Sequence, residues 1–363
     1  MPRQDVSMGE SWAAQRTEPL SDPLEPTDPL SGIATAIDWP DLQAEADART
    51  WREAGGRLDG QLASLVEWLS GVQASFPPHD LRRARLVIFA ADHGIAEAGV
   101  SARPAGSTNI QAADVAAGAD PYGGLAHFTT AGLRVVDVGL VEPVRGIDTR
   151  VAQRGTGRID RENALSAEAA EAAVRAGASV ADEEIDCGAD LLLAAALGVG
   201  GSTAAAAVIS IVTGIEPAKV VGRGSGIDDN AWMRKLAAVR DARWRSLPYR
   251  QDQLGLLAAC GGSDLAALTG FLLRAASRRT PVVIDGVVTL AAALVAHEVA
   301  PRAMRWWTVA HAVPDRGYQA ALPRLGLRPI LDLHLRRGDG VGALISLPLL
   351  RAAVLLAGGD TKS

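Results

Sequence analysis

The stretch DLLLAAALGVGGSTAAAA, residues 190–207, joins an apolar run, a glycine-rich turn and an alanine-rich segment. A short apolar run that closes on glycines is typical of a buried strand ending in a turn. The alanines that follow are strong helix formers. We therefore expect a strand, a tight turn and a helix in succession, which is the repeating unit of an α/β protein.

Similar apolar runs recur on both sides of this segment, with alanine-rich helical stretches between some of them. The further candidate strands lie at 85–94, 133–140, 219–226, 281–286, 305–315 and 328–340, and the helical stretches at 166–184 and 287–300. This alternation predicts an α/β fold with a mostly parallel, Rossmann-like sheet flanked by helices. Ligands of such sheets bind at the carboxyl ends of the strands.

The two ends of the chain differ from this pattern. Residues 1–35 are rich in Pro, Asp, Glu and Ser, and we expect a flexible tail. Residues 36–80 read as helical, since leucines and a valine recur at helical spacing within 62–69. The large α/β domain is placed at 81–340. The C-terminal helix within 341–363 is expected to pack with the N-terminal helices.

The composition excludes several classes of protein. The 363 residues carry a net charge of −6 and are 48% hydrophobic, which excludes a disordered chain and argues against nucleic-acid binding. Two cysteines cannot form a disulfide framework. The first 20 residues lack the apolar core of a signal peptide, and the apolar stretches 191–214 and 342–358 read as buried elements. We expect a soluble, cytoplasmic protein that acts on small molecules, without nucleic-acid or membrane partners.

The glycine turn is a candidate phosphate site. Glycines let the backbone approach a ligand closely, and the following helix presents free N–H groups and a partial positive charge. No lysine follows the last glycine, so this is not a Walker A loop. A purely structural turn fits the pattern equally well. The candidate residues are Gly198, Gly200, Gly201, Ser202 and Thr203.

Two charged residues in glycine-rich segments are further candidates. Lys235, one of three lysines in the chain, lies within GRGSGIDDNAWMRKL (222–236). It is either a compact cation for a phosphate or carboxylate, or a solvated helix residue. Asp339 stands between Gly338 and Gly340 before an apolar helix. It is either a helix cap or a general base in a cleft.

The loop after the first candidate strand reads ADHGIAEAGVSARPAGSTNIQ (91–111). Asp92 and His93 stand at its start, where they either hydrogen-bond the loop or contact a ligand. With six histidines in the chain and no HxH or HExxH pattern, we expect no metal site.

Taken in chain order, seven segments together resemble the nicotinate-nucleotide:dimethylbenzimidazole phosphoribosyltransferase family, from about residue 41 to 356. They are RLVIFAADHGIAEAGVSARP, RGTGRIDRENALS, ADEEIDCGADLLLAAALGVGGSTAAAA, VVGRGSGIDD, CGGSDLAALTGF, RRTPVVIDGVVTLAAALVA and PILDLHLRRGDGVGA. The resemblance implies phosphoribosyl transfer from nicotinate mononucleotide to 5,6-dimethylbenzimidazole or a related base, in assembly of the lower ligand of cobalamin. The products would be α-ribazole 5′-phosphate and nicotinate. It also implies a homodimer without a cofactor, each chain having a small helical domain built from both chain ends.

The resemblance also implies roles for the candidate residues. The glycine turn with Lys235 would hold the phosphate, and Gln111 would contact the base. Asp92 and His93 would shape the loop beside the base pocket. Asp339 would be the general base, in place of the glutamate of the family motif RLGEG.

Several positions depart from the family pattern. An acid of the family motif GEMGIG is replaced by Ala196, and Asp315 stands where glutamate is usual. A catalytically weak or inactive paralogue, which binds the mononucleotide or base in a regulatory role, is therefore the alternative.

Overall fold

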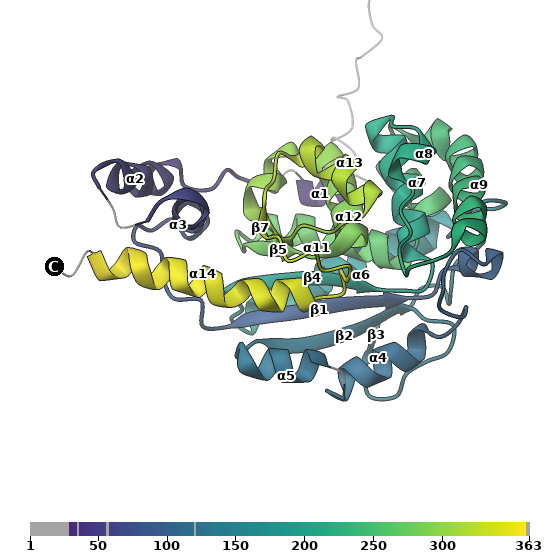
Figure 1. Ribbon diagram of the computed structural model, residues 1–363, viewed down its shortest axis with the longest axis horizontal. Coiled ribbons are helices and arrows are strands. Elements are labelled where there is room, and N and C mark those ends of the chain that lie inside the picture. Colours follow the sequence, from purple (N-terminus) through teal and green to yellow (C-terminus); the bar gives the residue numbers. More distant parts are fainter. Residues whose placement is uncertain (1–28, 35, 56–57, 120, 361–363) are drawn as a thin grey trace, which may run out of the picture.

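A seven-stranded sheet forms the centre of the computed structural model, which describes residues 29–34, 36–55, 58–119 and 121–360. All neighbouring strands are parallel, in the order β3-β2-β1-β4-β5-β6-β7 (Figure 1). The strands are β1 (Ala84–Ala91), β2 (Gly132–Gly139), β3 (Asp148–Thr149), β4 (Leu191–Leu197), β5 (Val282–Ile284), β6 (Trp307–His311) and β7 (Pro329–Leu331). The predicted parallel α/β sheet is confirmed.

The strand order reverses between β1 and β4. From β1 the chain builds outward through β2 to β3, returns to β4 on the other side of β1, and continues outward to β7. At such a reversal the connections leave the sheet in opposite directions and open a crevice at the carboxyl ends. Asp92 follows β1 directly and Gly198 follows β4, so both segments lie at this crevice.

Both faces of the sheet are buried. In β1, Val87 and Phe89 join the apolar core on one face, while Leu86 and Ile88 join the core on the other. Because successive side chains of a strand point to opposite faces, a strand covered on both sides is expected to be mostly apolar. This burial explains why the strands can be recognised as continuous apolar runs in the sequence.

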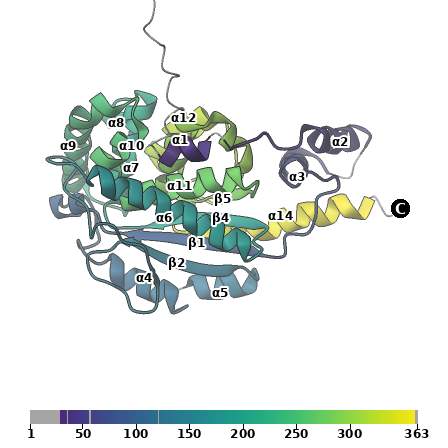
Figure 2. The ribbon, with the colours of Figure 1, turned by 180° about the vertical axis from the view of Figure 1, so that it is seen from behind.

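Helices cover the two faces. Helices α6, α11 and α12 lie over one face, and α4, α5 and α14 lie over the other (Figures 1 and 2). Helix α7 packs between α9, α12 and α13. The helices are α1 (Pro29–Ala34), α2 (Leu42–Glu53), α3 (Gly60–Gln73), α4 (Thr108–Ala116), α5 (Pro121–Phe128), α6 (Ala167–Asp186), α7 (Gly201–Thr213), α8 (Pro217–Val220), α9 (Asp229–Ser246), α10 (Gln253–Leu256), α11 (Ser263–Ser277), α12 (Gly286–Val299), α13 (Arg316–Leu325) and α14 (Val341–Asp360).

The two ends of the chain meet at α3 and α14. Helix α3 packs against both α2 and α14 (Figure 1). This packing supports our proposal that both chain ends build a small helical domain. Of the expected flexible tail, residues 1–28 and 35 lie outside the described residues, and 29–34 form α1 with Leu30 buried.

Helix α14 is long and apolar enough to meet the length requirement of a membrane span over Val341–Gly358, the single such case in the described ranges. Half of that window is buried within the fold, where α14 contacts α3, α5, β4, β6 and β7.

One predicted strand is wrong. Residues 219–226 form the end of α8 and an irregular loop. Pro217 starts that helix, and Gly224 and Gly226 adopt positive φ angles of 48° and 89°, which an extended strand does not accommodate. Val220 and Val221 are buried between helices, so their apolar character reflects helix packing.

Candidate active site

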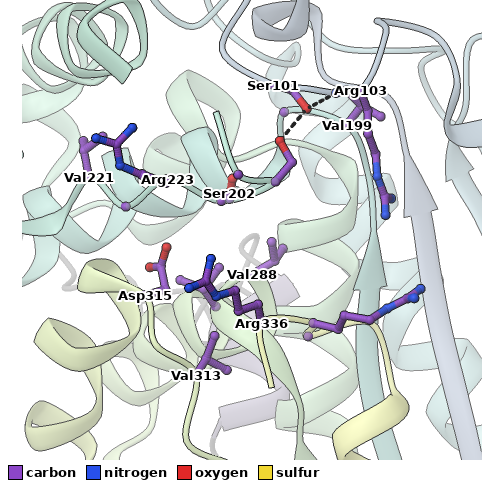
Figure 3. A pocket seen from close by; sticks show the side chains of 18 of the residues that line it. Ser101, Arg103, Val199, Ser202, Val221, Arg223, Val288, Val313, Asp315 and Arg336 are labelled. Atoms are coloured by element: carbon purple, nitrogen blue, oxygen red, sulfur yellow. Dashed lines mark hydrogen bonds between the residues drawn. The ribbon is translucent and has the colours of Figure 1, made fainter. Parts of the chain in front are cut away.

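A cavity of about 800 Å³ opens at the carboxyl ends of the strands. Its walls come from the turn after β4, the loop between α8 and α9, the start of α12, the loop after β6 and the loop after β7. Figure 3 shows Ser202 and Arg223 on one side of the cavity, with Asp315 and Arg336 facing them from the other. The crevice expected at the strand reversal is therefore a real cavity.

The glycine turn forms part of this cavity wall. Gly200 precedes α7 with φ 96°, a conformation that strongly favours glycine. A Cβ atom on Gly200 would lie 2.9 Å from Cβ of His93, and one on Gly198 would lie 2.6 Å from the Ala91 carbonyl oxygen. The turn therefore packs tightly against the segment after β1. In the first turn of α7, the N–H groups of Gly201 and Thr203 donate to the carbonyl oxygens of Gly198 and Gly200, and the partial positive charge of the helix N-terminus lies at this turn.

Ser202 and Lys235 meet at the edge of the turn. The Lys235 Nζ donates a hydrogen bond of 2.9 Å to Ser202 Oγ, although α9 and α7 are far apart in the sequence. Lys235 is 1% exposed, and burial lowers its pKa to about 8 while Asp315 acts to raise it. The ammonium group is thus enclosed next to the cavity wall with one neutral hydrogen-bond acceptor, which suits it to an anionic ligand.

Not every residue of the glycine turn faces the cavity. Gly198, Gly200 and Ser202 line it. Gly201 and Thr203 are buried on the other side of the turn, outside the cavity lining, and the Thr203 hydroxyl has no hydrogen-bond partner among the described residues.

Asp339 lines the same cavity from the opposite side, in the turn that precedes α14. Its Oδ2 atom accepts a hydrogen bond of 3.1 Å from Arg337 Nε. Its Oδ1 atom is buried without a well-aligned hydrogen-bond partner among the described residues. Burial and the neighbouring Asp339 carboxylate both raise the pKa of the Tyr122 hydroxyl. Arg337 therefore fixes the orientation of a carboxylate whose side chain is 13% exposed at the cavity wall.

The turn that carries Asp339 is held in place by the buried side chain of Asp285. Asp285 Oδ2 accepts hydrogen bonds from the backbone nitrogens of Gly340 at 3.0 Å and Ala343 at 3.2 Å, which caps the start of α14. His311 Nε2 lies 3.0 Å from Asp285 Oδ1. Burial lowers the pKa of His311, but Asp285 and nearby backbone carbonyls raise it, and the net shift is upward. Asp285, held by His311, fixes the backbone around Asp339.

A second cavity of about 380 Å³ adjoins the first. It is lined by Gln111 and Tyr122 among other side chains, and it shares Arg103, Leu197 and Arg337 with the larger cavity. The Gln111 side-chain oxygen accepts a hydrogen bond from the Arg103 guanidinium. Gln111 is therefore separated from the glycine turn but lies in a space continuous with Asp339.

Asp92 and His93 lie under the turn, outside the linings of both cavities. Asp92 Oδ2 accepts a hydrogen bond of 3.0 Å from the Val141 nitrogen, and His93 Nε2 lies 3.0 Å from Asp264 Oδ2. Burial lowers the pKa of His93, but Asp264 raises it, with a net upward shift. The partners lie after β2 and at the start of α11, so these contacts are neither hydrogen bonds within the loop at 91–111 nor contacts with the cavities.

Arginines of the cavity wall were not among the residues predicted from the sequence. Arg336 makes no hydrogen bond or ion pair with any described residue, so its guanidinium is free for an anion. These arginines come from separate segments of an arginine-rich chain, and no local pattern marks them. The arginines that line the larger cavity are Arg103, Arg223, Arg316, Arg336 and Arg337. Across the described ranges, no cluster of three or more His, Cys, Asp or Glu could hold a metal ion.

Comparisons with known proteins agree on one family. A family model described as phosphoribosyltransferase matches residues 41–361. A nicotinate-nucleotide–dimethylbenzimidazole phosphoribosyltransferase of Mycobacterium tuberculosis is 46% identical over 323 residues, covering 88% of this chain and 90% of the relative. The protein of the same name from Streptomyces avermitilis is 47% identical over 337 residues, covering 90% of each. The crystal structure of the Thermus thermophilus protein of this name superposes with a TM-score of 0.82 at 33% identity, covering 88% of this chain and 96% of that one.

Proposed function

This chain belongs to the nicotinate-nucleotide–dimethylbenzimidazole phosphoribosyltransferase family, and from that premise we propose that it moves a phosphoribosyl group from nicotinate mononucleotide to 5,6-dimethylbenzimidazole or a related base. The products are α-ribazole 5′-phosphate and nicotinate, and the reaction serves assembly of the lower ligand of cobalamin. The chain is a phosphoribosyltransferase by family, and the substrates follow from the names of its relatives.

One observation carries the proposal: the glycine turn and Asp339 line a single cavity from opposite sides. A mononucleotide has a phosphate at one end and the reacting anomeric carbon at the other. The reaction therefore needs an anion site and a base within one enclosed space, held in line. The cavity supplies both.

We assign the phosphate to the turn formed by Gly198, Gly200 and Ser202, with Lys235 alongside. The N-terminus of α7 and the Lys235 ammonium both favour a dianion there. Gly201 and Thr203 contribute to the shape of the turn from its buried side. His93 contributes in the same way, since its ring fills the space under the glycines.

We assign the incoming base to the second cavity, beside Gln111 and Tyr122. The azole nitrogen attacks the anomeric carbon with its lone pair, and the bond from that carbon to the nicotinate nitrogen breaks. Nicotinate leaves with the bonding electrons as a neutral pyridine ring, so it needs no proton. The N–H proton of the azole passes to the Asp339 carboxylate, which lines the cavity, and later to solvent.

An inactive, purely binding paralogue was the alternative. Nothing in the comparisons favours it, and a carboxylate is retained in the cavity despite Ala196 and Asp315 at altered positions. We also propose that the protein is cytoplasmic and forms a homodimer.

The test is product analysis. The purified full chain is incubated with nicotinate mononucleotide and a mixed pool of azoles, and products are identified by mass spectrometry. We expect α-ribazole 5′-phosphate among the products, and nicotinate in an amount equal to the sum of all ribosylated azoles. Binding of both substrates by calorimetry without product after long incubation would instead establish the paralogue.

A further inference from the structure

Arg337 contacts both Asp339 and Tyr122, and it lines both cavities. Its Nε donates to Asp339 Oδ2 at 3.1 Å, and one of its terminal nitrogens donates to the Tyr122 hydroxyl at 3.0 Å. Its side chain is 45% exposed, and that exposed part belongs to the lining of both cavities. Arg337 therefore stands at the junction between the space assigned to the nucleotide and the space assigned to the base.

These contacts leave part of the guanidinium free. A guanidinium has five N–H donors. The Nε donor and one donor of a terminal nitrogen are used, and the other terminal nitrogen, Nη1, has no partner among the described residues. The wall of the second cavity thus carries an available charged donor, where Val115, Leu197 and Ile110 offer only apolar surface.

Tyr122 and the backbone hold Arg337 in this place. Tyr122 is 1% exposed, so its hydroxyl is a fixed acceptor for the guanidinium. His311 also contacts the main-chain carbonyl of Arg337. An arginine held at both its backbone and its tip loses little further freedom when a ligand binds.

We propose that Arg337 is a specificity-determining residue of the base site, and that the chain prefers an azole whose distal ring carries a hydrogen-bond acceptor or an anionic group. Such a group pairs with the free donors of Arg337, whereas a wholly apolar distal ring leaves a guanidinium desolvated without a partner. In the same contact, Arg337 positions the Asp339 carboxylate by donating to Oδ2. The inference rests on the proposed function for the identity of the site.

The test compares two bases that differ at the distal ring, 5,6-dimethylbenzimidazole and benzimidazole-5-carboxylate. Their dissociation constants are measured by calorimetry in the presence of inorganic phosphate, which occupies the anion site without turnover. The proteins are the wild type, R337L, R337K and R328L. Arg328 is exposed, precedes β7 and lines neither cavity, so R328L controls for loss of a positive charge nearby.

We expect the wild type to bind the carboxylate-bearing base more tightly. The ratio of the two dissociation constants should shift by about tenfold or more toward the dimethyl base in R337L. It should stay within a few-fold of wild type in R337K and R328L. Y122F removes the fixed acceptor, and it should shift the ratio of dissociation constants in the same direction by less. This variant replaces R337L in the test if R337L fails to fold.

The inference is overturned if folded R337L leaves the ratio unchanged. If R337L does not fold, an unchanged ratio in Y122F overturns it. An equal shift in R328L also overturns it. The proposed function fails separately, if the wild type binds these bases but yields no ribosylated product from nicotinate mononucleotide. Because calorimetry with phosphate needs no catalysis, the two failures are distinguishable.

Discussion

Lys235 on α9 donates a hydrogen bond of 2.9 Å to Ser202 in the first turn of α7. Gly224 closes over this contact, since a Cβ atom there would lie 2.9 Å from the Ser202 hydroxyl and 3.1 Å from the Lys235 nitrogen. Two helices and a loop therefore converge on one ammonium group at the edge of the cavity. The arrangement links the proposed phosphate site to the packing of α7 and α9.

Replacing Lys235 should weaken nucleotide binding. In K235M we expect KM for nicotinate mononucleotide to rise roughly 10- to 100-fold, because a charge-assisted hydrogen bond to phosphate is lost. The fold should persist, since methionine fills a similar buried volume without a charge. K219M is the matched control, because Lys219 is exposed on α8. Equal KM values for wild type and K235M would remove Lys235 from the phosphate site.

The same residue gives a pH dependence. Burial lowers the pKa of Lys235 to about 8, so the ammonium is present below that pH and is lost above it. We expect KM for nicotinate mononucleotide to rise in the wild type as the pH passes about 8. The measurement is steady-state kinetics of both proteins from about pH 6.5 to about pH 9.5. K235M should show no such rise in KM.

Removing the base should slow the chemical step. In D339N we expect kcat to fall by roughly 100- to 10,000-fold, the usual contribution of a positioned general base. D339E retains a carboxylate and should keep more activity. D332N is the control in the same loop, because Asp332 is exposed and pairs only with His334 among the described residues. Turnover of D339N at the wild-type rate contradicts the role.

The glycine turn can be tested by adding one methyl group. G200A places a Cβ atom 2.9 Å from His93 at a φ of 96°, and we expect it to destabilise the fold by about 3 kcal/mol and weaken phosphate binding. G146A is the matched control, because Gly146 has φ 89° with nothing within 4 Å, and it should cost about 1 kcal/mol. Urea denaturation measures both. Equal losses would mean that the tight contact with His93 is unimportant.

The pair of His311 and Asp285 should make stability depend on pH. The folded pKa of His311 lies above its ordinary value of 6.5. The pair therefore stabilises the fold fully below pH 6.5, and this stabilisation is lost as the pH rises through the folded pKa. H311Q should lower the free energy of unfolding by about 3 kcal/mol below pH 6.5. It should lower it by less above the folded pKa of His311.

Chemical denaturation of wild type and H311Q, from below pH 6.5 to above the folded pKa of His311, measures the difference in their free energies of unfolding. H334Q controls for the loss of a histidine, since His334 is exposed. A difference between wild type and H311Q that does not change with pH would show that the pair is not charged.

The candidate site was predictable where one segment supplies both structure and chemistry. The glycine turn could be recognised because a buried strand, a turn with positive φ and a helix N-terminus each leave a local mark in the sequence. Asp339 was recognised through its glycine neighbours and the family resemblance. Asp92 and His93 were singled out because they begin the loop after the first candidate strand, but they pack against the glycine turn outside both cavities.

The sequence could not separate Ser202 from Thr203. Neighbouring residues of a helix point about 100° apart. Which of them meets a ligand therefore depends on how the helix is rotated against the rest of the fold. Packing of α7 against its neighbouring helices buries Thr203 and leaves Ser202 at the cavity beside Lys235.

By itself the sequence determined the parallel α/β sheet and the strand–turn–helix unit at 190–207, because burial on both faces makes the central strands largely apolar. Only the tertiary structure decided which distant side chains meet. Arg337 reaches Tyr122 across a separation of 215 residues, and the arginines of the cavity come from different loops. Such contacts depend on the order of strands in the sheet and on the packing of helices over it, and no local sequence pattern records them.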